Sequence, residues 1–209
     1  MKRLLLLLGI FCVVLFSGCT QNSSSVTVQD GVSGEENNPG ISTPSEIVPF
    51  QADGIISPNE YQYEILGNQD KLKIYWRDDG DSVSLGLVSK ATGWVAIGFE
   101  PKMMMQDADI IIGDVKDGET VVLDEYSTGP TGPHREDTVL GGTSDLTAFG
   151  GSEENGITVI EFSRLKDTKD SYDTLLTSDK PIKIIWALAD TDVLDMKHNI
   201  ARGSTEIKQ

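Results

Sequence analysis

Short apolar runs separated by glycine-containing turns constrain the fold of this chain more than any other feature. Alternation of apolar and polar residues places successive side chains on opposite faces, as in a half-buried strand. Asp-Gly and Asn-Gly dipeptides between such runs are typical of hairpin turns. Turns are expected at residues 79–81, 116–118 and 154–156. Strands are expected at residues 72–76, 83–87, 94–99, 110–115, 120–126, 156–162 and 182–189.

The run at 94–99, Trp-Val-Ala-Ile-Gly-Phe, is apolar on both faces and predicts a central strand. No helical periodicity extends beyond a turn or two, and only residues 170–176 are expected to form a short helical turn. Many short strands with few helices are typical of two antiparallel sheets packed face to face. The sequence therefore predicts an all-β fold, an antiparallel β-sandwich.

The first nineteen residues have the pattern of an export signal. Lys2 and Arg3 precede an apolar run at 4–16, and Ser17-Gly18-Cys19 follows. This run is too short to cross a bilayer as a helix, which needs about 20 residues. The Ser-Gly-Cys ending resembles the lipobox of prokaryotic lipoproteins, in which the cysteine is acylated after cleavage. We therefore expect residues 1–18 to be removed and Cys19 to be lipidated; the alternative is an ordinary secretory signal with Cys19 incidental.

Residues 19–48 are rich in Ser, Thr, Asn, Gly, Glu and Pro. Such a segment buries too little apolar surface to offset the entropy cost of ordering it. It is expected to be a disordered tether that carries the lipidated cysteine, followed by a single domain at 49–209. The protein is then expected outside the cytoplasm, anchored to the cell membrane by lipid.

Charge and cysteine content exclude several classes of function. The chain has 17 basic and 33 acidic residues, a net charge of −16, which argues against nucleic-acid binding. Cys12 lies in the leader and Cys19 is the lipidation site, so disulfides, cysteine metal sites and covalent haem attachment are excluded for the domain. No phosphate loop, GxSxG or HExxH motif occurs, and the acidic residues are expected mostly on solvated faces. No catalytic constellation is seen, so the chain is not expected to be an enzyme.

Two features of the sequence stand out because their side chains can bind metals. Met103, Met104 and Met105 are consecutive in a loop after the central strand, and His198 follows the last expected strand. A thioether and an imidazole together can ligate low-spin haem iron, and the same donors also suit copper. Methionines packing a loop and a solvated histidine would explain the pattern equally well. His134 is expected to be a solvated loop histidine.

Several motifs together resemble the DOMON domain family, which includes the cytochrome domain of cellobiose dehydrogenase. The most specific are Gly-Trp-Val-Ala-Ile-Gly-Phe at 93–99 and Met-Gln-Asp-Ala-Asp-Ile at 105–110. An Asp-Gly-x-Ile…Glu-Tyr segment at 52–61 resembles the family's entry segment. Further matches lie at residues 155–156, 162–164, 185–187, 198 and 202–203.

The resemblance implies an immunoglobulin-like β-sandwich that binds haem b or a sugar at one end. In haem-binding members a methionine of the first loop and a histidine near the C-terminus are the axial ligands, which correspond here to Met105 and His198. Asp107 replaces a glycine of the family pattern, which affects the local loop conformation. Lys197 is a further candidate because some relatives use lysine in place of the histidine.

The resemblance also suggests residues around the cofactor. Trp94, Phe99 and Trp186 are candidates for the walls of the pocket, with plain core packing as the alternative. Arg202 is a candidate for pairing with a haem propionate through bidentate hydrogen bonds, with an ordinary surface arginine as the alternative.

Taken together, we expect a surface-anchored, b-type cytochrome-like protein that transfers electrons and holds haem b non-covalently between Met105 and His198. A separate redox protein would be its partner, and the acidic surface would favour a basic patch on that partner. The first alternative is a carbohydrate- or ligand-binding DOMON module without haem. The second is a copper-binding lipoprotein that uses methionine and histidine.

Overall fold

The computed structural model describes residues 47–67, 70–177 and 179–208. The expected leader, Cys19 and residues 20–46 of the expected tether lie outside the described residues. No helix in the described part of the chain has the length and apolar character that a bilayer crossing would require.

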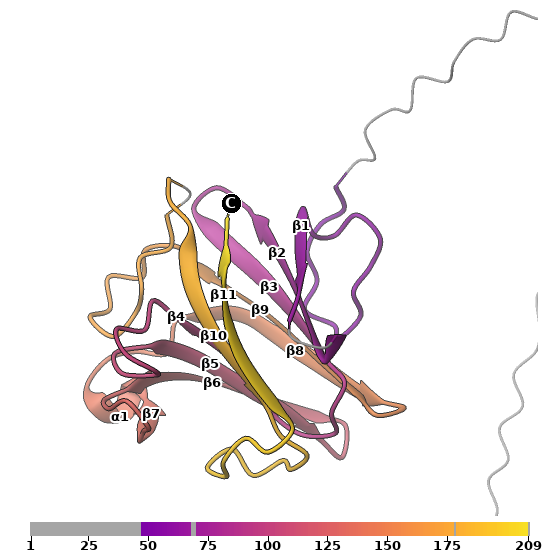
Figure 1. Ribbon diagram of the computed structural model, residues 1–209. Helices are drawn as coiled ribbons and strands as arrows, with labels where there is room; N and C mark the ends of the chain where they lie inside the picture. The colour runs from indigo at the N-terminus through magenta and orange to yellow at the C-terminus, as the bar shows by residue number, and fades with distance from the viewer. Residues whose placement is uncertain (1–46, 68–69, 178, 209) are drawn as a thin grey trace, which may run out of the picture. The chain divides into compact units, whose positions relative to one another are not determined.

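The described residues form two antiparallel sheets (Figure 1). One sheet has the strand order β1-β2-β3-β9-β8, and the other has the order β11-β10-β4-β5-β6-β7. The strands are β1 (Tyr63–Leu66), β2 (Leu72–Asp78), β3 (Ser82–Ser89), β4 (Val95–Phe99), β5 (Asp109–Lys116), β6 (Glu119–Ser127), β7 (His134–Glu136), β8 (Leu146–Glu154), β9 (Ile157–Leu165), β10 (Ile182–Leu188) and β11 (Ala201–Ile207). A short helix, α1 (Asp137–Leu140), follows β7.

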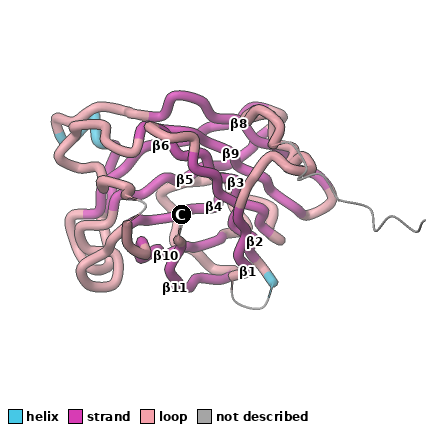
Figure 2. The backbone as a smooth tube through the Cα atoms, turned by 90° about the horizontal axis from the view of Figure 1, so that it is seen from above, coloured by secondary structure: helices cyan, strands magenta, loops and turns pink. Residues whose placement is uncertain are grey.

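The predicted β-sandwich is therefore confirmed, and strands dominate the described backbone (Figure 2). All seven expected strands are present, with ends that differ by at most three residues. The 94–99 run forms β4, which pairs with β5 on one side and β10 on the other. All five residues of β4 are buried. This explains why its sequence does not alternate, since both faces of a covered central strand need apolar side chains.

The main core lies between the two sheets and is built from the inward-facing residues of alternating strands. On β4 these residues are Val95, Ile97 and Phe99. They belong to the same core cluster as Leu85 and Phe162 of the other sheet. Trp76 of β2 links the two sheets, because its indole N–H donates a hydrogen bond of 2.8 Å to the backbone carbonyl of Lys208, which follows β11.

The segment 52–61 is held by a buried carboxylate and not by strand pairing. Glu161 on β9 accepts hydrogen bonds from the backbone N–H of Gly54, at 2.7 Å, and from the hydroxyl of Tyr61, at 2.6 Å. Gly54 has φ 79°, and a Cβ there would lie 2.4 Å from the backbone of Gly151. The Asp-Gly…Glu-Tyr motif thus attaches the segment that precedes β1 to the five-stranded sheet.

The structure corrects the prediction for residues 170–176. They contain no helix, because their polar groups bind other parts of the chain: Thr174 donates its N–H to Asp109 and accepts a hydrogen bond from Arg164. The helix observed is α1, which was not expected. The short or weakly alternating strands β1, β7, β8 and β11 were also not expected.

Candidate functional site

The outer face of the six-stranded sheet, which points away from the other sheet, is unusually apolar at its centre. The strand registers place outer-face residues in two rows across the sheet. One row contains, in order, Arg202, Ala187, Ala96, Ile112 and Leu123. The next row contains Ser204, Ile185, Gly98, Ile110 and Glu125. The outer face of an antiparallel sheet is commonly polar because it meets water, so these apolar rows indicate a covered surface.

Small residues at the centre of these rows let larger neighbours close over β4. A Cβ added to Gly98 would lie 2.9 Å from Ile185 and 3.2 Å from Ile110, so the glycine is required by this packing. Ala96 and Ala187 are side by side in the adjacent row. The result is a flat apolar surface, which we call the outer-face cluster. Its buried members are Trp94, Ala96, Ala108, Ile110, Ile112 and Ala189.

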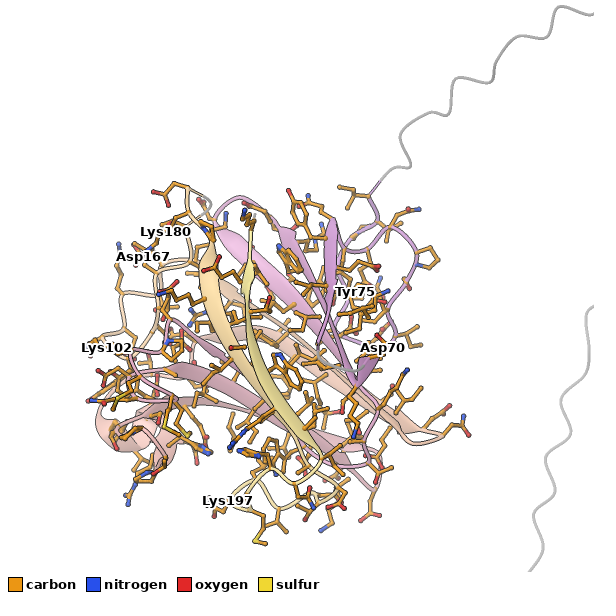
Figure 3. All side chains as sticks on the ribbon, viewed as in Figure 1. Asp70, Tyr75, Lys102, Asp167, Lys180 and Lys197 are labelled. Atoms are coloured by element: carbon orange, nitrogen blue, oxygen red, sulfur yellow. The ribbon has the colours of Figure 1, made fainter. Side chains whose placement is uncertain are left out.

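Two loops from opposite ends of β4 cover the outer-face cluster. The β4–β5 loop contributes Met105, and the β10–β11 loop contributes Leu194; both side chains are partly buried against the cluster. Figure 3 labels Lys102 in the first loop and Lys197 in the second, which flank the candidate donors on the chain. The two loops that carry the predicted ligands therefore meet the same apolar surface.

The β4–β5 loop sets Met105 apart from the two methionines before it. Met103 and Met104 are 57% and 62% exposed, whereas Met105 is partly buried. The backbone N–H of Met105 donates to the carbonyl of Pro130, and its own carbonyl accepts from Ala108. Met105 is thus held at the sheet, while Met103 and Met104 face solvent. Of the three methionines, Met105 is therefore the one that lies against the outer-face cluster.

Asp107 shows why the family pattern has a glycine at its position. Its φ is 57°, in the left-handed region that glycine adopts most easily and that aspartate tolerates better than most residues. Its carboxylate lies 2.8 Å from the ammonium group of Lys102, an exposed ion pair that brings the two sides of the loop together. The replacement therefore keeps the turn.

His198 lies in the β10–β11 loop beside the start of β11. Its Nε2 is 3.5 Å from a guanidinium nitrogen of Arg202, which is exposed and belongs to the row that contains Ala187 and Ala96. Partial burial and the nearby guanidinium lower the pKa of His198. The imidazole is therefore mostly neutral at pH 7, the form that ligates metals.

The three predicted aromatic wall residues lie on different faces. Phe99 and Trp186 belong to the core between the sheets, so their side chains are on the side of β4 and β10 that faces away from Met105. Trp94 belongs to the outer-face cluster together with Met105. The structure thus associates Met105 and Trp94 with the same apolar cluster, places Arg202 next to His198, and assigns Phe99 and Trp186 to the core instead.

The expectation of a solvated His134 is wrong. The residue lies on β7, is partly buried, and its Nδ1 forms a hydrogen-bonded ion pair with Glu125. This contact raises the pKa of His134. Both residues belong to the outer side of the sheet, so His134 marks the polar border of the outer-face cluster. Its pairing depends on the register of β6 and β7, which the sequence pattern did not reveal.

The sequence reasoning also missed a set of buried charges on the inner face of the same sheet. Asp109 and Asp124 are buried, as is Arg164 on the facing β9. A guanidinium nitrogen of Arg164 lies 2.8 Å from Asp109, so the ion pair crosses between the sheets. These two aspartates are exceptions to the expectation that the acidic residues lie mostly on solvated faces. The only available signal was that Asp109 begins a run of three isoleucines.

Comparison with known proteins identifies the family of this domain. The family model of the DOMON domain matches residues 68–189. DBH-like monooxygenase protein 1 of Mus musculus is 29% identical over 147 residues, and the human protein is 27% identical over the same length. These matches cover 69% of this chain but only 23% of each relative, so the chain spans less than a quarter of their length.

Two solved structures share the fold at low sequence identity. The cytochrome b domain of pyranose dehydrogenase from Coprinopsis cinerea has a TM-score of 0.53 and 13% identity, over 69% of this chain and 80% of that domain. The cytochrome domain of cellobiose dehydrogenase from Myriococcum thermophilum has a TM-score of 0.50 and 10% identity, over 70% and 80%. Since the family model covers more than half of the chain, and the sandwich and its loops follow the expected pattern, this protein belongs to the DOMON domain family.

Proposed function

We propose that this domain binds haem b non-covalently on the outer face of its six-stranded sheet and transfers single electrons. The observation that carries the proposal is the outer-face cluster, which two loops cover, one with Met105 packed against it and the other with His198. An apolar surface beside a thioether and an imidazole suits a porphyrin ring and its iron. The two structural neighbours are both cytochrome domains, which supports the same function.

Each residue of the site has a distinct task in this proposal. Met105 and His198 would be the axial ligands, and a methionine ligand raises the reduction potential. Arg202, exposed beside His198, is placed to pair with a propionate. The bound haem supplies one-electron chemistry. If Met105 and His198 both hold the iron, they would leave no site on it for a substrate, and the domain would act as an electron carrier.

The main alternative, a sugar-binding module, has less support. Sugar sites commonly use an open aromatic face, but the three tryptophans of this chain, Trp76, Trp94 and Trp186, are only 6%, 4% and 4% exposed. Within the described residues no tryptophan therefore offers an open platform. The donors also suit copper, but the apolar surface of the outer-face cluster favours a planar organic cofactor over a bare ion.

Absorption spectroscopy of the chain expressed with ample haem tests the proposal. We expect a Soret band with sharp α and β bands after reduction by dithionite. Met105→Ala or His198→Ala should abolish the low-spin spectrum, whereas Met103→Ala should leave it unchanged because Met103 is exposed. A colourless wild-type protein would contradict haem binding, and a spectrum retained in both ligand variants would contradict the assigned ligands.

We further propose that the chain is a lipoprotein whose domain exchanges electrons with a separate redox protein. The leader and Ser17-Gly18-Cys19 support the anchor, and the net charge of −16 favours a basic partner surface. Cys19→Ala should move the protein from the membrane fraction to the soluble fraction. Unchanged membrane association of that variant would contradict lipidation at Cys19.

A further inference from the structure

The inner face of the six-stranded sheet contains a compact group of three carboxylates. Asp109 begins β5, Asp124 lies on β6, and Asp173 lies in the segment between β9 and β10. One carboxylate oxygen of each lies within 4.8 Å of those of the other two. Asp109 and Asp124 are 1% and 3% exposed. We call these three residues the inner acid group.

The hydrogen bonds of this group leave oxygens unused. Asp109 accepts through Oδ2 from Arg164 and from the backbone N–H of Thr174, each at 2.8 Å. Asp124 accepts through Oδ2 from the backbone N–H of Asp145, at 2.8 Å. The Oδ1 atoms of Asp109 and Asp124 are buried and have no hydrogen-bond partner among the described residues. Buried carboxylate oxygens without partners are costly, so they point to a ligand.

The local charge is also unbalanced. The guanidinium nitrogens of the fully buried Arg164 lie 2.8 Å from a carboxylate oxygen of Asp109 and 3.0 Å from one of Asp173. This single positive charge faces three carboxyl groups. Asp137, also buried, adds a fourth carboxyl, and neither of its oxygens has a partner among the described residues. Arg164 therefore offsets the charge of only one carboxylate, and the others become neutral only by protonation or by binding a cation.

We propose that Asp109, Asp124 and Asp173 bind a divalent cation, Ca²⁺, between the two sheets. The donors are all oxygens, which suit a hard cation, and no cysteine or histidine belongs to the group, which disfavours zinc and copper. Calcium accepts irregular sets of six to eight oxygens, whereas Mg²⁺ keeps several waters in a strict octahedron. A buried, irregular group assembled from two strands and a loop fits calcium better.

The position gives such an ion a structural task. It would join β5, β6 and the 167–176 segment at the end of the sandwich where Asp109 follows the β4–β5 loop. Met105 lies four residues before Asp109, so the ion would fix the base of the loop that covers the outer-face cluster. The cation site is formed by different residues from the haem site, and each can be tested without the other.

Thermal unfolding of the haem-free full chain tests this proposal. After removal of metals with EDTA, Ca²⁺ at constant ionic strength should raise Tm progressively, by on the order of 5–10 °C at a hundredfold excess over Kd. Calorimetric titration should give one Ca²⁺ per chain. Asp124→Asn should abolish the rise, while Asp117→Asn, in the exposed β5–β6 turn, should retain it.

Two outcomes would overturn the proposal. One is a wild-type Tm that is the same in Ca²⁺ and in EDTA, which can be read even if the Asp124 variant does not fold. The other is an equal rise with Na⁺ at matched ionic strength, which would indicate general screening of acidic charge. Because the titration uses haem-free protein, a chain that binds Ca²⁺ but stays colourless with haem would reject only the proposed function.

Discussion

The two faces of the six-stranded sheet bury different chemistry. The outer face is apolar, and the candidate donors Met105 and His198 belong to the two loops that pack against it through Met105 and Leu194. The inner face carries Asp109 and Asp124 on the strands themselves, paired across the sandwich with Arg164. Loop donors can adjust to an incoming cofactor, whereas strand donors are fixed by the register of the sheet.

Substitutions in the two groups should therefore differ in how much folding stability they cost. Charged side chains between the sheets have lost their water, so each depends on its partner. The outer-face donors are partly solvated and neutral, so their substitution should cost little folding stability when no cofactor is bound. Substitutions on the inner face should therefore act first on stability, and substitutions on the outer face should act first on binding.

The largest effect is expected from removing the buried guanidinium group of Arg164 on the facing strand β9. Arg164→Met should lower the free energy of unfolding by about 3–5 kcal/mol, because the remaining carboxylates stay buried without a counter-charge. Arg202→Met, on the exposed end of the outer face, should change it by less than about 0.5 kcal/mol. Urea denaturation of the two variants measures the contrast, and similar losses for both would remove the proposed distinction between the faces.

A smaller effect is expected from overfilling the outer face. Gly98→Val places a side chain where a Cβ alone would lie 2.9 Å from Ile185. We expect a loss of about 1–3 kcal/mol from overpacking, together with weaker haem binding because Ile185 must move. Ser204→Ala, in the same row at the sheet edge, is the control. Haem titration and urea denaturation check the result, and normal haem affinity in the Gly98 variant would place the cofactor elsewhere.

The smallest effect concerns the pH dependence of the inner face. Burial, followed by the carboxylates of Asp124, Asp173, Asp109 and Asp170, raises the pKa of Asp137 to about 8. The folded state then holds a proton that the unfolded state releases near pH 4, so the stability from Asp137 is complete below about pH 4 and is lost as pH rises through 8.

Asp137→Asn mimics the protonated form and should therefore be more stable than wild type at pH 8 to 9, with little difference near pH 4. Urea denaturation in EDTA across this pH range measures the effect. A wild-type protein that gains stability as pH rises, with no change of slope in the Asn variant, would contradict a raised pKa at Asp137.

Most of the fold followed from local pattern. The seven expected strands alternate or are fully apolar, and the Asp-Gly and Asn-Gly turns separate them, so sequence neighbours decide their conformation. Strand β11 was missed because Ala-Arg-Gly-Ser-Thr-Glu-Ile has little apolar content, and it is a strand through its pairing with β10. Residues 170–176 were mistaken for a helical turn because their contacts to Asp109 and Arg164 are distant in sequence.

The candidate sites differ in the same way. Met105 and His198 stood out because methionine and histidine are rare here and carry specific chemistry. Asp109 and Asp124 are two of 33 acidic residues, and nothing local separates a buried aspartate from a solvated one. Burial depends on which strand lies opposite, and that strand, β9, is far away along the chain.

The sequence by itself determined the β-sandwich, the family and the pair of candidate haem ligands, because periodicity, turns and rare residue types are local properties. Only the tertiary structure decided which face of the sheet each side chain occupies. It placed Met105 and Trp94 on the outer face, Phe99 and Trp186 in the core, and three aspartates together beside Arg164. The physical reason is that strand register and sheet packing bring together residues that are far apart along the chain, and burial then sets their chemistry.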